Sequence, residues 1–143
     1  MMRKLFLILV AVSVLFLASA HRVWASSDHI SAQQVTADDK AFFQEIKQAI
    51  ESHDAKWIAE NINLPLNVNI NGKKFSIKTE KSFIKNYDNI ITTTIVEAVR
   101  LQDENDKFKH WQGIMIGRGQ IWFGQYIDEK VNRSFYYIKA INN

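Results

Sequence analysis

The sequence has no cysteine, a single proline and only five glycines in 143 residues. Without cysteine there is no disulfide framework, no thiolate metal ligand and no thiol nucleophile, so the folded domain depends on packing for its stability. A lipid-modified amino-terminal cysteine is excluded for the same reason. An exported protein without cysteine is more typical of the periplasm of Gram-negative bacteria than of small disulfide-rich secreted domains.

The amino terminus has the pattern of an export signal. Arg3 and Lys4 precede an apolar run over residues 5–20, which is shorter than the about 20 residues that a membrane-spanning helix needs. We therefore predict a signal peptide over residues 1–25, cleaved after Ala25 or after Ala20. The mature protein would be periplasmic or secreted and would have no stable membrane anchor.

Cleavage also changes the charge. It removes Arg3, Lys4 and Arg22 and leaves 15 of the 18 basic residues, equal to the 15 acidic ones. The sequence pI of about 9.1 therefore belongs to the precursor. A near-neutral mature chain gives no support for a nucleic-acid partner.

Residues 26–35 are polar and predict a flexible tail, and residues 36–143 predict a single domain. Thr36 is a candidate N-cap, followed by acids in the first helical turn. The helix predicted after it has a helical period of apolar residues, namely Phe42, Phe43, Ile46, Ala49 and Ile50. Asp54 can cap a second helix that carries Trp57, Ile58 and Ile62, and Pro65 marks its end.

From Leu66 the apolar period changes to two, and the turn at Asn71 and Gly72 predicts a β-hairpin that ends at Ile77. Thr79 can cap a helix with Phe83, Ile84 and Tyr87 on its buried side, and a further helix is expected over residues 95–101. Three strands follow, over residues 108–116, 120–127 and 134–141. The fold class is therefore α+β, with helices on one face of a strongly curved, mainly antiparallel sheet.

In this order of elements, the chain resembles the nuclear transport factor and ketosteroid isomerase superfamily, the cone-shaped fold also called SnoaL-like. The resemblance covers the mature chain and includes the break at His53 and Asp54 and the pattern GIMIG-x-G-x-IWF over residues 113–123. That pattern resembles a recurring sequence feature of small exported proteins of Gram-negative bacteria, most of which have no assigned activity. The fold hosts enzymes as well as binding modules, so it does not define function.

The catalytic residues of the isomerase branch can be sought position by position. Its tyrosine corresponds to Ile46, which cannot donate a hydrogen bond, and its base to Asn67 or Asn69, which do not titrate. Isomerase chemistry is therefore not expected. For any other acid–base enzyme on this fold the candidates are His110, Asp88 and Tyr87, with Asp103 as a second possible partner of His110.

Other kinds of site find little support. The histidines lack metal-ligand spacing, so no metal and no cofactor are expected. The segment from Gly117 to Gly119 could suggest a phosphate cradle, but between two strands it favours a hairpin turn.

The aromatic residues give the candidate ligand-binding set, which is Trp57, Tyr87, Trp111, Trp122 and Tyr126. Alternation predicts that Trp111, Gly113 and Met115 share one strand face, and that Trp122, Gly124 and Tyr126 share another. One set would line a cavity and the other an outer surface, without the pattern deciding which, and ordinary core packing explains the same residues.

Three functions fit these observations. The first is a non-catalytic exported module that holds a small apolar ligand or a protein partner. The others are a small isomerase, cyclase or dehydratase, and an inhibitor or immunity-type protein of a cell-envelope enzyme. The resemblance implies a possible homodimer through the open sheet face.

Overall fold

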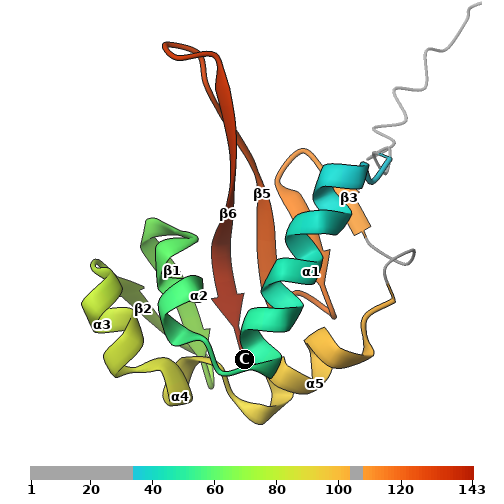
Figure 1. Ribbon diagram of the computed structural model, residues 1–143. Coiled ribbons are helices and arrows are strands. Elements are labelled where there is room, and N and C mark those ends of the chain that lie inside the picture. The colour runs from blue at the N-terminus through green and yellow to red at the C-terminus, as the bar shows by residue number, and fades with distance from the viewer. Residues whose placement is uncertain (1–33, 104–107) are drawn as a thin grey trace, which may run out of the picture.

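The computed structural model describes residues 34–103 and 108–143, apart from the side chains of Phe108 and His110. The signal peptide and most of the tail predicted over residues 26–35 lie outside the described residues. Helices pack against one six-stranded sheet, so the α+β class is confirmed (Figure 1). No helix in the described part of the chain is both long and apolar enough to cross a membrane.

Helix α1 (Ala37–Glu51) begins with a capping box. The Thr36 side chain accepts from the Asp39 amide at 3.2 Å, and the Asp39 carboxylate accepts from the Thr36 amide at 2.7 Å. The five apolar positions predicted for its inner face are all buried. The apolar period thus confirms both this helix and its packing face.

Helix α2 (Ala55–Glu60) is capped by Asp54, which accepts from the Trp57 amide at 2.9 Å. The prediction that Ile62 belongs to this helix is wrong, because Ile62 is the first residue of strand β1 (Ile62–Ile70). The Asn61 carbonyl already accepts from the Ile138 amide at 2.8 Å. The chain therefore joins the sheet at Ile62, so α2 ends before it reaches Pro65.

The predicted hairpin is confirmed as β1 and β2 (Lys73–Ile77), with Ile70 opposite Lys73. Asn71 and Gly72 both have positive φ, at 51° and 75°. This is the conformation that a two-residue hairpin turn requires and that Asn-Gly adopts readily.

The helix predicted after the cap Thr79 is divided in two. Helix α3 (Glu80–Lys85) ends at Asn86, whose side chain donates to the Ser82 carbonyl at 2.8 Å, and α4 (Tyr87–Ile90) follows. Ile84, expected to be buried, is 44% exposed, whereas Phe83 and Tyr87 are buried. Helix α5 (Thr93–Leu101) then begins after the N-cap Thr92.

The prediction of a single strand over residues 108–116 is wrong. The chain turns at Trp111 and Gln112, so β3 (Phe108–His110) and β4 (Gly113–Ile116) form a hairpin with His110 opposite Gly113. Gly113 has a φ of 133°, and a Cβ there would collide with the Phe123 carbonyl oxygen. Trp111 lies in the turn, so it does not share a strand face with Gly113 and Met115.

Strands β5 (Ile121–Asp128) and β6 (Arg133–Asn142) complete the sheet, in the order β2-β1-β6-β5-β4-β3. Among the described strands only β1 and β6 pair in parallel, so the sheet is mainly antiparallel. The core includes Phe43, Ile46, Leu66, Phe83, Ile95, Ile114, Phe123 and Ile141.

The far end of β5 and β6 extends beyond the rest of the sheet. Strand β4 pairs with β5 no further than Phe123, and β1 pairs with β6 no further than Ile138. Residues 124–137 therefore form a two-stranded ribbon that projects from the domain (Figure 1). We call this segment the ribbon.

Candidate binding site

The two faces of the ribbon carry different side chains. Tyr126 pairs with Phe135, Gly124 with Tyr137, and Gln125 with Tyr136. Because directly opposed residues share a face and neighbours alternate, Tyr126, Phe135 and Tyr137 lie on one face, and Tyr136 lies on the other. Tyr126 is 59% exposed and Phe135 is 38% exposed. The face that carries them therefore presents aromatic rings to solvent, and we call it the outer face.

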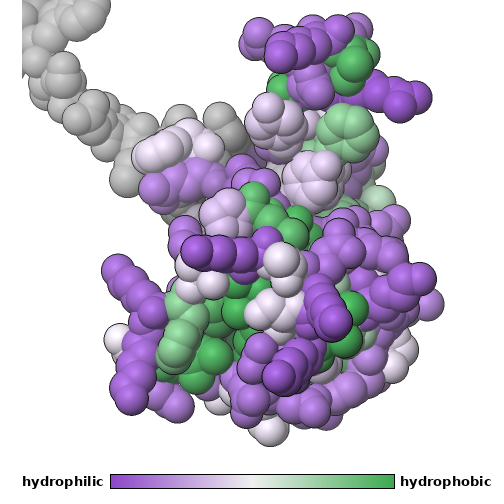
Figure 2. All heavy atoms as spheres, turned by 90° about the vertical axis from the view of Figure 1, so that its left-hand side faces the viewer, coloured by the Kyte–Doolittle hydropathy of each residue, from purple (hydrophilic) through white to green (hydrophobic). Residues whose placement is uncertain are grey.

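The tip of the ribbon is also apolar. Ile127 and Val131 are 61% and 57% exposed, and Figure 2 shows hydrophobic side chains at the projecting tip between hydrophilic ones. An isolated two-stranded hairpin is at best marginally stable in water. Exposed apolar side chains on such a segment are typical of an interaction surface.

The inner face of the ribbon is fixed to α1 by a buried carboxylate. Asp39, 2% exposed, forms an ion pair with Lys109 of β3 and accepts from the Tyr136 hydroxyl at 3.0 Å. Its other hydrogen bond, from the Thr36 amide, caps the helix. One side chain thus joins α1, β3 and the base of the ribbon.

This arrangement sets the charges of the group. Burial raises the pKa of the Asp39 carboxyl, but hydrogen bonds from Lys109, Thr36 and Tyr136 outweigh it and hold that pKa below its ordinary value of 3.8. Burial, with the hydrogen bond to Asp39, raises the pKa of Tyr136 to about 12. At neutral pH Asp39 is therefore charged and Tyr136 is protonated, which suits a structural pair rather than a proton-transfer pair.

A groove of about 580 Å³ lies between α1 and β6, and we call it the α1–β6 groove. It is lined by Asp38, Ala41, Phe42, Glu45, Glu60, Asn61 and residues 134–137. Phe42 stacks on Tyr136 with ring centroids 5.3 Å apart. Among the described residues that line it, three are acidic and none is basic.

Comparisons of the chain with protein-family models, with curated proteins and with solved structures gave no match.

The predicted ligand-binding residues do not converge on one cavity. Trp57 is half-buried and packs on Phe42, with their ring centroids 5.8 Å apart. It borders a hollow of about 190 Å³ that adjoins the groove at Glu45. Trp111 is 78% exposed in the β3–β4 turn.

Of the remaining members, Tyr126 lies on the ribbon and Trp122 is half-buried on β5. The strand register is consistent with the prediction that Trp122, Gly124 and Tyr126 share a face. Tyr87, by contrast, is buried on α4, away from the ribbon. Its ring centroid lies 5.0 Å from that of His53.

The predicted acid–base set is not brought together. Tyr87 and Asp88 belong to α4, which borders a hollow together with β1 and β2, whereas His110 belongs to β3 at the opposite edge of the sheet from β2. The His110 side chain lies outside the described part of the chain.

Asp88 instead pairs with His53, with Nε2 and Oδ1 3.0 Å apart, and both side chains are largely exposed. Burial, with the charges of Asp88 and Asp54, raises the pKa of the Tyr87 hydroxyl. Within the described residues that buried hydroxyl has no hydrogen-bond partner. An exposed histidine–carboxylate pair lacks the desolvated setting of a tuned catalytic pair.

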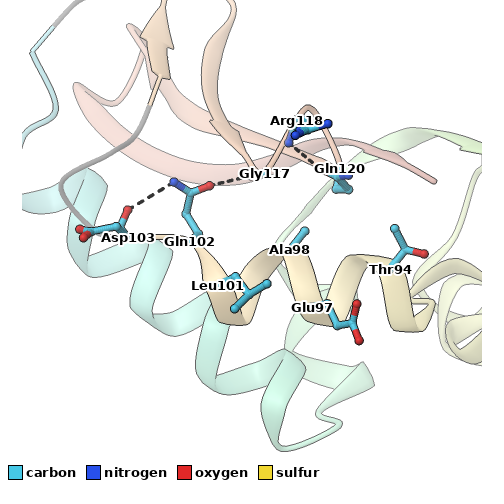
Figure 3. Close-up of a pocket in the computed structure, with 9 residues that line it drawn as sticks. All are labelled: Thr94, Glu97, Ala98, Leu101, Gln102, Asp103, Gly117, Arg118 and Gln120. Carbon is cyan, nitrogen blue, oxygen red and sulfur yellow. Dashed lines mark hydrogen bonds between the residues drawn. The ribbon is translucent and has the colours of Figure 1, made fainter.

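The segment from Gly117 to Gly119 is a hairpin turn, as expected. The Gly117 amide donates to Gln102 Oε1 at 2.7 Å and the Arg118 amide to Gln120 Oε1 at 2.6 Å, as Figure 3 shows, and the Gly119 amide donates to the Ile116 carbonyl. All three amides are thus already used, so none is available to cradle a phosphate.

The same turn borders a hollow of about 410 Å³ beside α5. In Figure 3 the side chains of Glu97 and Leu101 point away from the turn, whereas Ala98 points towards it. The charged groups therefore do not converge on a ligand. Nor do the described residues contain a group of three potential metal ligands.

Sequence reasoning missed the acidic groove and the role of Phe135. Asp38 and Glu45 are seven residues apart on α1 and Ala41 lies between them, so they share a helix face. That spacing was a usable signal. The position of this face beside β6 depends on tertiary packing and had no signal in the sequence.

Proposed function

We propose that the protein is an exported, non-catalytic binding module that holds a protein partner through the ribbon. The observation that carries the proposal is the outer face, where Tyr126 and Phe135 remain exposed on a ribbon that projects from the domain. Protein interfaces are enriched in tyrosine and phenylalanine. The basic and apolar amino-terminal sequence supports export.

A protein partner fits the ribbon better than a small ligand does. A small-molecule site encloses most of its ligand in a concave apolar pocket, whereas the outer face and tip form an extended, projecting surface. An inhibitor of a cell-envelope enzyme is one form that such a module can take, because a projecting ribbon can enter a cleft of its target.

We also propose, on the resemblance, that the domain belongs to the cone-fold superfamily of nuclear transport factor and ketosteroid isomerase. The sequence of elements supports this, with two helices, a hairpin, further helices and then the long strands. Ile46 is a fully buried core residue and Asn67 is exposed. Neither side chain can take part in proton transfer, which supports a binding role.

The test of this function is capture of a partner from a cell-envelope extract. Tyr126→Ser combined with Phe135→Ser removes both exposed rings, and we expect it to retain about tenfold less partner than the wild type, since interface aromatics carry much of the binding energy. The matched control is Phe75→Ser, a 50% exposed phenylalanine on β2, which should retain as much as the wild type. Equal retention by all three proteins contradicts the proposal.

The enzyme alternative is tested separately by His110→Ala. A binding module should keep its partner and its melting temperature when this side chain is removed. Loss of a measurable activity from a well-folded His110→Ala protein would instead support an acid–base enzyme.

A further inference from the structure

The α1–β6 groove is acidic because α1 separates its charges. Asp38 and Glu45 line the groove, whereas Lys47 lies on another side of the helix and donates to the Arg100 carbonyl of α5 at 3.3 Å. Within the described residues, neither Asp38 nor Glu45 has an ion-pair partner. The adjoining hollow adds Asp54 and is likewise lined without a basic residue in the described chain.

The third acid of the groove is partly compensated. Glu60 lies 3.6 Å from Lys56 in an exposed pair, and such pairs contribute little. The charge of Asp39 is matched by Lys109. The uncompensated negative charge is therefore that of Asp38 and Glu45.

The floor of the groove is aromatic and fixed in place. The Phe42 and Tyr136 rings are stacked at an interplanar angle of 30°, and the Tyr136 hydroxyl is held by Asp39. Ring faces carry negative potential and attract lysine and arginine head groups, while their apolar surface accommodates the methylene stems.

A backbone edge borders the same groove. The described ladder between β1 and β6 stops at Ile138, so β6 has no strand partner on that side over residues 133–137. Glu60 and Asn61, which lead into β1, line the groove together with residues 134–137. The open edge of β6 therefore faces the groove, in line with β1, and such an edge can accept an added strand.

We propose that the α1–β6 groove binds an extended segment of the protein partner that carries lysine or arginine. The segment adds to the edge of β6 at residues 134–137 and places a basic side chain over the half-buried Tyr136 ring, between Asp38 and Glu45. This inference rests on the proposed function, since it names the chemistry of the partner segment. Phe135 belongs to both the outer face and the groove, whereas Tyr126 belongs only to the outer face, and Asp38 and Glu45 only to the groove.

The experiment uses a fluorescent peptide that alternates lysine and valine, and a second peptide with glutamate in place of lysine. By fluorescence polarisation at low salt, we expect the lysine peptide to bind about tenfold more tightly than the glutamate peptide and to weaken as salt rises. Amide NMR signals of residues 134–137 should shift on binding. No difference between the peptides, or shifts confined to other residues, would overturn the proposal.

Isosteric variants test the acids. Asp38→Asn combined with Glu45→Gln should lower the affinity for the lysine peptide about tenfold. Glu51→Gln combined with Glu97→Gln, an equal charge change outside the groove, should leave that affinity unchanged. Equal weakening by the two pairs would mean non-specific attraction and would refute the site. A concentration-dependent dimer that only the first pair disrupts would assign the groove to a second copy of the chain and would also refute it.

Capture from extract separates the two proposals. If Tyr126→Ser alone reduces capture and the double variant Asp38→Asn with Glu45→Gln captures normally, the groove proposal fails and the proposed function stands. If neither change affects capture, both fail.

Discussion

Replacing Asp39 with asparagine lowers the free energy of unfolding by about 3 kcal/mol, as the loss of one partner of a buried ion pair does. The carboxylate is fully buried and holds Lys109, Tyr136 and the Thr36 amide. The substitution leaves the Lys109 ammonium, whose side chain is only 20% exposed, without its counter-charge. Denaturant unfolding monitored by circular dichroism measures the loss.

Asp38→Asn is the control at the neighbouring position, and it should change stability by less than about 0.5 kcal/mol because the side chain is exposed. Combining Asp39→Leu with Lys109→Met should recover part of the lost stability, since an apolar pair can replace a buried ion pair. A loss equal to that of Asp38→Asn would show that the buried pair does not stabilise the fold.

The ion pair and hydrogen bonds of Asp39 also make the free energy of unfolding depend on pH. The folded pKa of Asp39 lies below its ordinary value of 3.8, so its stabilising contribution is present above about pH 4 and is lost as pH falls through the folded pKa. The Asp39→Asn protein should therefore lose less stability than the wild type on acidification over this range.

Phe123→Ala has the second large effect, a loss of about 4 kcal/mol in the free energy of unfolding. Phe123 on β5 is fully buried, and its ring lies 5.6 Å from that of Phe42 on α1. Truncation leaves a cavity between the sheet and the first helix, below the base of the ribbon. The measurement is again denaturant unfolding.

Phe75→Ala removes the same atoms from a half-exposed position on β2 and should cost no more than about 1 kcal/mol. Similar losses at Phe123 and Phe75 would contradict the placement of the core between α1 and the sheet.

Local patterns in the sequence were sufficient for α1 and for the first hairpin. The Thr36 cap, the apolar period to Ile50 and the Asn71–Gly72 turn act over a few residues, so no tertiary information was needed. The β3–β4 turn was missed because Trp111 and Gln112 are not typical turn residues, and only Gly113 marks the bend. Ile62 was assigned to a helix because its pairing depends on Ile138, far along the chain.

The candidate site was harder to predict. Tyr126 was identified from its position on a strand, but the exposure of the ribbon depends on where β4 and β1 stop pairing. From the sequence, Asp39 is only one of the acids expected in the first turn of the helix after Thr36. Its partners Lys109 and Tyr136 are 70 and 97 residues away, so its role as a link between α1 and the ribbon could not be derived from local sequence.

Site-specific photo-crosslinking tests most directly whether the ribbon is the docking surface. A photoreactive benzophenone amino acid would replace Tyr126 in the full chain, expressed in the cells that produce it, and in a second protein it would replace Phe75. The account predicts one discrete protein adduct from position 126 and none of that mass from position 75. The same adducts from both positions, or none from position 126, would contradict it.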